Sequence, residues 1–402
     1  MTPDDRRLDP DAPLAGPPDP WAETDMPTPR HGPPWHMTEM IEAEPAIAVR
    51  ILERLARDGS AARLAEAVVE TAEAGDPVAV VGCGTSEHGA RAVATILGGA
   101  MSNAGRPRSI QAFEAGVDTF EATGPALVIG VSHEGATWAT MLALETAREG
   151  GAATALITVS GRAPAAELAD IVLETGELDT SWCHTVGYLS PIVAAIAITG
   201  AARQDRPDPE EARALLHAGL EAGGVAATEA VAAVLARAER IVVIGSGTDR
   251  IAARELTLKI EEGTHIPAAF RDVETLLHGH LAGMDASTAV VAIAAEPRES
   301  DARARRLVQA LRAAAAIGVP AAAILTADYD AAVPAELLPA GRIVLPGDAP
   351  SLGRSARALL ATAVPLQLLT ERIARVRGVN PDPIRRDDAR YLRAAEVSSP
   401  TS

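Results

Sequence analysis

Three side chains in the second half of the chain are spaced so that they could transfer a proton. Glu255, Lys259 and Glu262 lie four and then three residues apart in a segment predicted to be a helix over residues 250–262, and this spacing places them on one face. A carboxylate beside an ammonium can move a proton on and off carbon while the cation stabilises the enediolate that forms. The same spacing is typical of a solvated, salt-bridged face, so both interpretations stay open.

Two further observations concern this region. Lys259 is the single lysine among 36 basic residues, and a lysine amine is a compact donor whose pKa can be tuned; chance retention on a solvated face is an equally good explanation. His278, in the segment Leu-Leu-His-Gly-His-Leu over residues 276–281, could act as a general acid or base with His280 as its neighbour. Two histidines do not give the ligand count of known metal motifs, so we expect neither metal nor cofactor.

Hydroxyl side chains follow two predicted strands of the first half. Gly84, Thr85 and Ser86 lie in one loop, Ser132 and Thr137 lie in the other, and each loop opens a predicted helix. Free N–H groups at a helix N-terminus, supplemented by hydroxyls, form a cradle for an anion such as phosphate. Ordinary N-capping is the competing interpretation. The equivalent second loop of the second half carries Ala295 and Glu296 instead, which predicts ligand anchoring in the first half and chemistry in the second.

An internal duplication positions these residues. A predicted strand over residues 77–82, followed by a helix, has a similar counterpart 163 residues later in the sequence. At the same offset the apolar run 126–131 aligns with the apolar run 289–294, which indicates a repeat. Short apolar strands alternating with amphipathic helices predict two doubly wound parallel sheets, an α/β fold. Ligands bind such sheets at the carboxyl ends of the strands. We expect the following division of the chain: a disordered Pro-rich tail over 1–36, domains over 37–205 and 206–378, and a polar tail over 379–402.

Composition limits the partners and the location. The net charge of −18 disfavours nucleic acid and anionic membranes. No stretch reaches the roughly 20 uninterrupted apolar residues that a membrane helix needs, and residues 1–20 lack the apolar core of a signal peptide. The two cysteines, Cys83 and Cys183, are too few for a disulfide framework. We therefore expect a cytoplasmic protein with reduced thiols.

Taken together, several segments carry a family resemblance that covers about residues 37–378. The chain resembles the sugar isomerase (SIS) domain family, in particular the isomerase half of glucosamine-6-phosphate synthase and related amino-sugar phosphate deaminases. The segments that match are 37–45 in the opening helix, 82–86 and 132–137 in the two sugar-phosphate loops, and 254–262, 277–279 and 364–369 in the second half.

The resemblance implies a role for each of these residues. Glu262 would be the base that moves a proton between C1 and C2, Lys259 would stabilise the developing oxyanion, and His278 would assist ring opening. In the family this histidine reaches in from the neighbouring subunit. A homodimer with its active site at the subunit interface is therefore implied, with a small sugar, phosphorylated in the family, as the ligand.

The chain departs from the family at several positions. Glu134 stands where the family has a phosphate-binding Ser, and His133 stands where it has Gln; a carboxylate beside a phosphate is costly unless it is protonated or paired. Cys183 and His184 fall where the family has a Ser-Thr pair, and we interpret them as pocket lining. The C-terminal lysine of the family is missing. Arg390 lies nearby in the sequence, but a guanidinium cannot replace an amine nucleophile. We also expect no glutaminase domain, because the 36 residues before the matching region are too short for one and position 2 is Thr rather than Cys.

Three hypotheses remain. We expect an isomerase or amine-releasing deaminase that acts on a sugar phosphate or amino-sugar phosphate without glutamine. An isomerase for a non-phosphorylated sugar derivative is the second hypothesis, because of Glu134. The third, from a different class, is a non-catalytic sugar-binding regulator; the retained Glu-Lys-His set argues against it.

Overall fold

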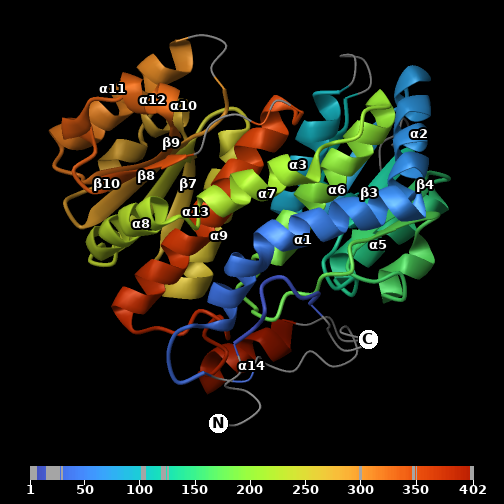
Figure 1. The fold of residues 1–402 in the computed structure, drawn as a ribbon, viewed down its shortest axis with the longest axis horizontal. Helices are drawn as coiled ribbons and strands as arrows, with labels where there is room; N and C mark the ends of the chain where they lie inside the picture. The colour runs from blue at the N-terminus through green and yellow to red at the C-terminus, as the bar shows by residue number, and fades with distance from the viewer. Residues whose placement is uncertain are drawn as a thin grey trace.

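Figure 1 shows the fold, a computed structural model that describes residues 7–14, 28, 30–100, 106–118, 124, 126–297, 301–345, 349 and 351–398. The described chain forms two α/β lobes, each built around one five-stranded sheet. Elements of the first half form one lobe and elements of the second half form the other, with α13 between them. The predicted α/β class is confirmed.

The first sheet is entirely parallel. Its strands are β1 (Val78–Gly82), β2 (Arg108–Gln111), β3 (Leu127–Val131), β4 (Ala153–Thr158) and β5 (Ile171–Glu174), in the order β2-β1-β3-β4-β5. The central strands β1 and β3 are buried at every residue, as expected of a sheet covered on both faces. Their β-branched residues suit this pleated, buried setting.

The second sheet repeats the first. Its strands are β6 (Arg240–Gly245), β7 (Ala268–Asp272), β8 (Thr288–Ala294), β9 (Ala321–Thr326) and β10 (Gly341–Leu345), and their parallel order, β7-β6-β8-β9-β10, is that of the first sheet. β1 ends at Gly82 and β6 ends at Gly245, the offset found in the sequence. The predicted pair of doubly wound sheets is therefore present, with the order known for flavodoxin-like folds.

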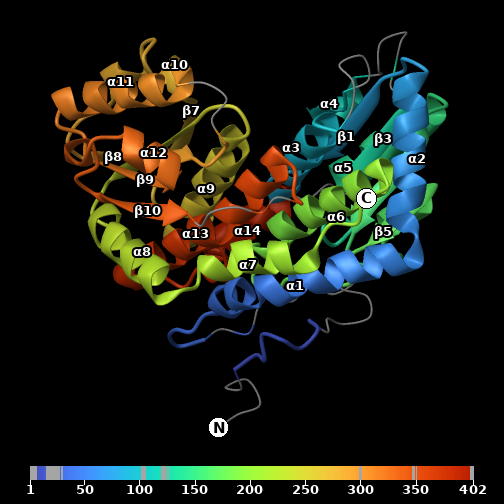
Figure 2. The same cartoon turned by 45° about the horizontal axis from the view of Figure 1, so that its top comes forward.

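Helices cover both faces of each sheet, and Figure 2 shows them from a second angle. Those of the first half are α1 (His36–Asp58), α2 (Ser60–Glu73), α3 (Thr85–Gly98), α4 (Ala112–Val117), α5 (Trp138–Glu149) and α6 (Val186–Arg203). Those of the second half are α7 (Pro209–Ala218), α8 (Ala222–Leu235), α9 (Asp249–Thr264), α10 (Val273–Leu276), α11 (Ala302–Ala316), α12 (Ala327–Ala332), α13 (Arg354–Arg377) and α14 (Ala389–Ser398). Short 3-10 turns occur at Pro164–Leu168, His280–Gly283 and Ala335–Leu337.

One apolar core joins the two halves. Its buried members come from α1, α3 and α6 as well as from α9 and α13, and α3 packs against α9 while α1 packs against α6, α7 and α13. Among the described helices, α6 is long and apolar enough to cross a membrane, but 83% of its residues are buried inside the structure. α7 and α8 reach the length and apolar character of a membrane span only if they are taken together as one bent pair. The division at residues 205 and 206 remains a prediction.

Both tails contact this body. Leu14 is 5% exposed and its N–H donates to Glu177, so this part of the N-terminal segment packs against the body; the disordered tail over residues 1–36 stays a prediction. Residues 1–6, 15–27 and 29 of that tail lie outside the described residues. At the other end, the Asp382 carboxylate accepts the backbone N–H groups of His36 and Met37 at 2.9 and 2.8 Å. It thereby caps α1.

Candidate active site

Residues from both halves line one small pocket at the carboxyl end of the first sheet. Its volume is about 170 Å³, and its described lining consists of Cys83, Thr85, Ser86, His133, Glu134, Thr137, His184, Gly187 and Glu262. Seven of these were candidates from the sequence. Cys83 and Gly187 were not, and nothing in their residue types would have pointed to them.

Glycines shape the two loops that enter the pocket. Gly84 adopts φ 57° immediately before α3, and a Cβ at Gly82 would lie 2.3 Å from the Ser86 carbonyl oxygen. In the second loop, Gly135 has φ 71° and a Cβ there would meet the Ala163 methyl at 2.4 Å. Only glycine fits such positions without strain. The chain therefore turns sharply enough to aim both helix N-termini, those of α3 and α5, at the pocket.

Ser132 supports the second loop from below. It is 1% exposed, donates a hydrogen bond to the Thr137 hydroxyl at 3.2 Å and accepts one from the Gly135 N–H at 3.2 Å. Both of its visible partners belong to the loop itself, and Ser132 does not line the pocket. Its role in this structure is to hold the loop, whereas Thr137 faces the ligand space.

A buried ion cluster lies behind the pocket. The Lys259 ammonium lies 2.5 Å from Glu262 Oε2 and 3.6 Å from Glu255 Oε1. The side chains of Lys259 and Glu255 are 0% exposed, whereas that of Glu262 is 22% exposed and lines the pocket. The helix face predicted from the spacing is therefore an internal one, and Glu262 is the member of the cluster that a ligand can touch.

The environment separates the two carboxylates in proton affinity. Burial raises the pKa of Glu262, and Lys259 offsets this only in part. Burial also acts to raise the pKa of Glu255, but Lys259 and hydrogen bonds from His88 and Thr85 outweigh it and lower that pKa. Burial would lower the pKa of Lys259, yet its two carboxylate neighbours raise it. A permanently ionised Glu255 beside a Glu262 with increased proton affinity is the arrangement by which enzymes assign different roles to paired acids.

His88 is a site residue that the sequence analysis missed. Its Nδ1 lies 2.6 Å from Glu255 Oε2, and the Thr85 hydroxyl donates to the other oxygen of Glu255 at 3.4 Å. Both residues lie in the first turn of α3, so the first half orients the acid cluster of the second. The only signal in the sequence is the placement of His88 three residues after Thr85, which puts both on one helix face.

Two neutral histidines, His133 and His184, line the pocket together with Glu262. His133 Nε2 accepts the Asp179 backbone N–H at 3.0 Å, so this nitrogen carries no proton and a neutral ring holds its proton on Nδ1. Burial and the neighbouring His184 lower the pKa of His133 to about 4, while burial and Lys259 lower the pKa of His184 to about 3. The rings meet edge to face with centroids 5.5 Å apart. Neither histidine is a counter-ion near neutral pH.

Asp179 holds the segment that carries Cys183 and His184. Its carboxylate accepts the N–H groups of Thr185 and Val186 at 2.6 and 2.8 Å, which satisfies free donors at the start of α6. Cys183 is 0% exposed and burial raises the pKa of its thiol well above the usual value. This thiol is a packing residue beneath the pocket rather than part of its lining, whereas His184 lines the pocket as expected.

Glu134 faces the pocket without a partner. It makes no hydrogen bond or ion pair with any residue that the structure describes, and burial, followed by Asp179, raises its pKa, with Arg386 acting in the opposite sense. The Arg386 guanidinium stacks 4.9 Å from the centroid of the Trp182 ring. Arg390 is exposed and pairs with Asp388, so it takes no part in the pocket.

His278 lies away from the pocket of its own chain. Its side chain is 69% exposed and pairs with Glu274 at 2.7 Å, one turn earlier. Glu274 also pairs with Arg306. A role for His278 in catalysis therefore requires a second subunit, as the family resemblance implies.

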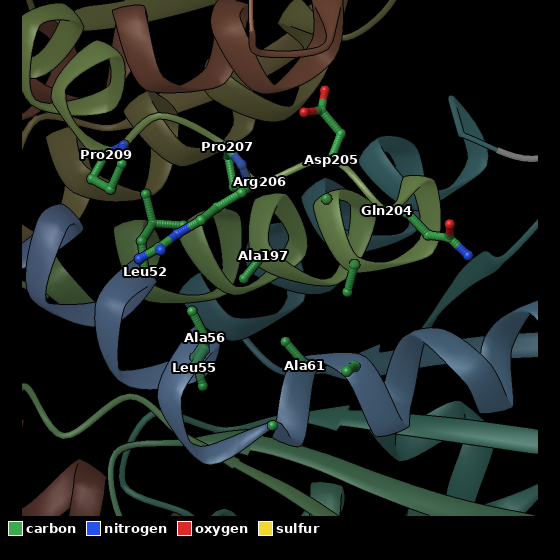
Figure 3. Close-up of a pocket in the computed structure, with 14 residues that line it drawn as sticks. Leu52, Leu55, Ala56, Ala61, Ala197, Gln204, Asp205, Arg206, Pro207 and Pro209 are labelled. Atoms are coloured by element: carbon green, nitrogen blue, oxygen red, sulfur yellow. The ribbon is translucent and has the colours of Figure 1, made fainter.

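Two larger cavities lie outside this site, and neither is lined by a residue of the Glu255, Lys259 and Glu262 cluster. One, of about 270 Å³, lies between α1, α2 and the end of α6 and is lined mostly by apolar side chains such as Leu52, Leu55 and Ala197 (Figure 3). The other, of about 730 Å³, lies between α6 and the start of α13; arginine and serine side chains line it together with Asp205 and Glu296, and Glu296 is engaged by Arg303. Among the described residues, no group of three or more His, Cys, Asp or Glu side chains could hold a metal ion.

Comparisons with known proteins identify the class. Residues 234–335 match the SIS domain family. The chain is 32% identical over 182 residues to the glutamine–fructose-6-phosphate aminotransferase (isomerizing) of Symbiobacterium thermophilum, an alignment that covers 42% of this chain and 30% of that protein. The chain thus spans less than a third of this curated relative.

Solved structures extend the likeness to both halves. The C-terminal domain of glucosamine-fructose-6-phosphate aminotransferase from Francisella tularensis superposes with a TM-score of 0.72 at 22% identity, covering 87% of this chain and 98% of that one. Tagatose-6-phosphate ketose/aldose isomerase from Escherichia coli gives a TM-score of 0.69 at 18% identity, covering 89% and 97%. Both halves of the chain therefore share the fold of these structures.

The chain therefore contains a SIS domain, as predicted, within the second half. More particularly, it is homologous to the isomerase domain of the aminotransferase over the aligned region.

Proposed function

We propose that this protein is a sugar isomerase or an amine-releasing deaminase in which Glu262 transfers a proton between C1 and C2 of an open-chain sugar. The observation that carries the proposal is the position of Glu262. It is the carboxylate of the buried cluster that reaches the pocket, and burial raises its pKa toward the range in which a carboxylate can both accept and return a proton near neutral pH.

Each neighbouring residue has a part in this reaction. Glu262 removes the proton at C2 and delivers it to C1, and the N-termini of α3 and α5 with Thr85, Ser86 and Thr137 hold the sugar's other end. Lys259 was expected to contact the developing oxyanion. A side chain that is 0% exposed behind Glu262 supports a positioning role instead, in which the ammonium fixes the carboxylate and tunes its proton affinity.

In an amino sugar the same proton transfer from C2 to C1 leaves an imine at C2, which water hydrolyses to a ketone with release of ammonia. The isomerase and deaminase reactions therefore share these residues. The likeness to sugar isomerases and to an aminotransferase domain supports this general kind of enzyme, and the reaction and substrate are parts of the proposal. We also propose a homodimer, because His278 is exposed and does not line the pocket of its own chain, whereas the family resemblance gives it a role in the neighbouring subunit. A cytoplasmic location is a further part of the proposal.

Heavy-water exchange tests the proposal. Incubation with candidate aldoses, ketoses and amino sugars, with and without phosphate, should incorporate deuterium at C1 or C2, with ammonia release if the reaction is a deamination. Glu262→Gln should slow exchange by about 10²–10⁴-fold. Glu261→Gln is the matched control, since Glu261 is an exposed neighbour on the same helix and its loss removes the same charge.

Two results would refute the assignment. Exchange that survives in Glu262→Gln would exclude Glu262 as the base. Thermal stabilisation by a sugar without exchange in any substrate would instead favour the non-catalytic regulator.

A further inference from the structure

The sugar-anchoring end of the pocket contains a carboxylate, Glu134, that pairs with no described residue. Glu134 lines the pocket together with Thr137, Thr85 and Ser86. Among the described lining residues none is Arg or Lys, and Glu134 itself has no ion pair or hydrogen bond with a described residue. A ligand held by these hydroxyls therefore lies beside a carboxylate that still needs a donor.

The groups around Glu134 do not supply that donor. His133 Nε2 accepts the Asp179 N–H, so protonating this nitrogen would break an existing hydrogen bond, and both His133 and His184 stay neutral near neutral pH. Asp179 is a second carboxylate that acts against ionisation of Glu134. Arg386 favours ionisation of Glu134, but its side chain does not line the pocket.

Helix geometry alone would favour an anion. The N-termini of α3 and α5 both open at the pocket, and helix N-termini attract negative charge. This attraction comes from partial charges, whereas Glu134 is a full charge at close range in a pocket of only about 170 Å³. Each helix end is equivalent to about half a positive charge, so the two together carry about one. The single negative charge of Glu134 at similar distance offsets that attraction, and a phosphate dianion in this pocket would gain little from the helix ends.

We propose that the group anchored by the 132–137 loop is a hydrogen-bond donor, a hydroxyl or an ammonium, and not a phosphate dianion, so that the substrate is a sugar or amino sugar unphosphorylated at that end. Glu134 accepts the donor's hydrogen and is the residue that sets this specificity. The inference rests on the proposed function for the identity of the pocket, but it concerns binding rather than turnover.

Thermal stabilisation of the full-length protein tests the inference without requiring catalysis. The probes are D-fructose, D-glucosamine, their 6-phosphates and inorganic phosphate, each titrated into wild type, Glu134→Ser and Glu134→Gln. Glu145→Gln is the control, because Glu145 is an exposed residue of α5 outside the pocket and its loss changes the net charge equally.

Wild type should bind the unphosphorylated probes in preference to the phosphorylated ones. Glu134→Ser and Glu134→Gln should each gain at least about tenfold in affinity for the phosphate-bearing probes, as the loss of one full charge at close range predicts. Glu145→Gln should gain no more than the small change expected of a screened surface charge. Circular dichroism establishes that each variant is folded, and two chemically different replacements keep the test open if one of them misfolds.

Some outcomes would overturn the inference. It fails if wild type binds the phosphate esters more tightly than the parent sugars, or if neither Glu134 variant gains affinity for phosphate relative to Glu145→Gln. Failure of the proposed function looks different: sugars would bind with the predicted preference, yet no deuterium would enter C1 or C2.

Discussion

Lys259 offers the sharpest test of the buried cluster. We expect Lys259→Met to remove the single cation that faces both Glu255 and Glu262 while keeping a side chain of similar length. The ammonium lies 2.5 Å from one carboxylate and 3.6 Å from the other, and its side chain is 0% exposed. The variant therefore leaves two carboxylates close together in a site that water reaches only at Glu262.

The size of the effect follows from this geometry. A pair of unit charges about 4 Å apart is worth about 4 kcal/mol at an effective dielectric constant of about 20, and removing one partner of a buried pair costs about 3–5 kcal/mol. Glu262 can relieve part of the strain by taking up a proton, and Glu255 keeps His88. We therefore expect the free energy of unfolding to fall by about 3 kcal/mol, toward the lower end of that range.

Urea denaturation followed by circular dichroism at pH 7 measures this loss. The double variant Lys259→Met/Glu262→Gln should recover at least about 1 kcal/mol, because one of the two unpaired charges is then gone. Arg305→Gln is the control: it breaks an exposed pair with Asp301 and should cost less than about 1 kcal/mol. A loss in Lys259→Met no larger than that of the control would refute the reasoning about the buried cluster.

Three further predictions concern other parts of the molecule. Gly135→Ala should destabilise the protein and weaken sugar binding, because a non-glycine residue at φ 71° is strained and its Cβ would meet the Ala163 methyl; a melting temperature equal to that of wild type would contradict this. Glu44 is fully buried and burial raises its pKa well above 4.5, so the native state keeps a proton that the unfolded chain releases. Its contribution to stability is complete below the unfolded pKa and declines as pH rises toward the folded pKa. The stability of Glu44→Gln relative to wild type should therefore grow as pH rises above about 4.5, whereas parallel pH curves would disprove a neutral Glu44. If each pocket takes its histidine from the partner in a two-fold dimer, mixing inactive Glu262→Gln and His278→Asn proteins should restore roughly a quarter of wild-type activity, because about half of the dimers are mixed and each of these has one intact pocket. No recovery after subunit exchange would count against a shared site.

The sequence was sufficient for the fold and for the face of α9. Apolar runs bounded by glycine predicted the central strands, and the spacing of Glu255, Lys259 and Glu262 predicted a common helix face because helical periodicity is local. Burial of that face was not predictable, since it depends on α3 from the other half packing against α9. His88 became part of the cluster through that packing alone.

Other features depend on contacts between distant segments. Asp179 shapes the pocket through N–H groups at the start of α6, and Arg386 approaches Glu134 from the C-terminal segment. Sequence spacing says nothing about either contact. Glu134 is the opposite case: its departure from the family pattern was visible in the sequence, and the structure adds that no described residue neutralises it.

The cap on α1 has a consequence for how the protein is made. Asp382 is separated from Met37, whose N–H it accepts, by 345 positions. At a synthesis rate of about 5–20 residues per second, roughly 20–70 s pass between the synthesis of Met37 in α1 and that of Asp382. An N-cap of this kind is worth about 0.5–2 kcal/mol. During synthesis the first lobe must therefore hold α1 without that contribution. The cap forms only after the segment that contains Asp382 has been made and has packed against the start of α1.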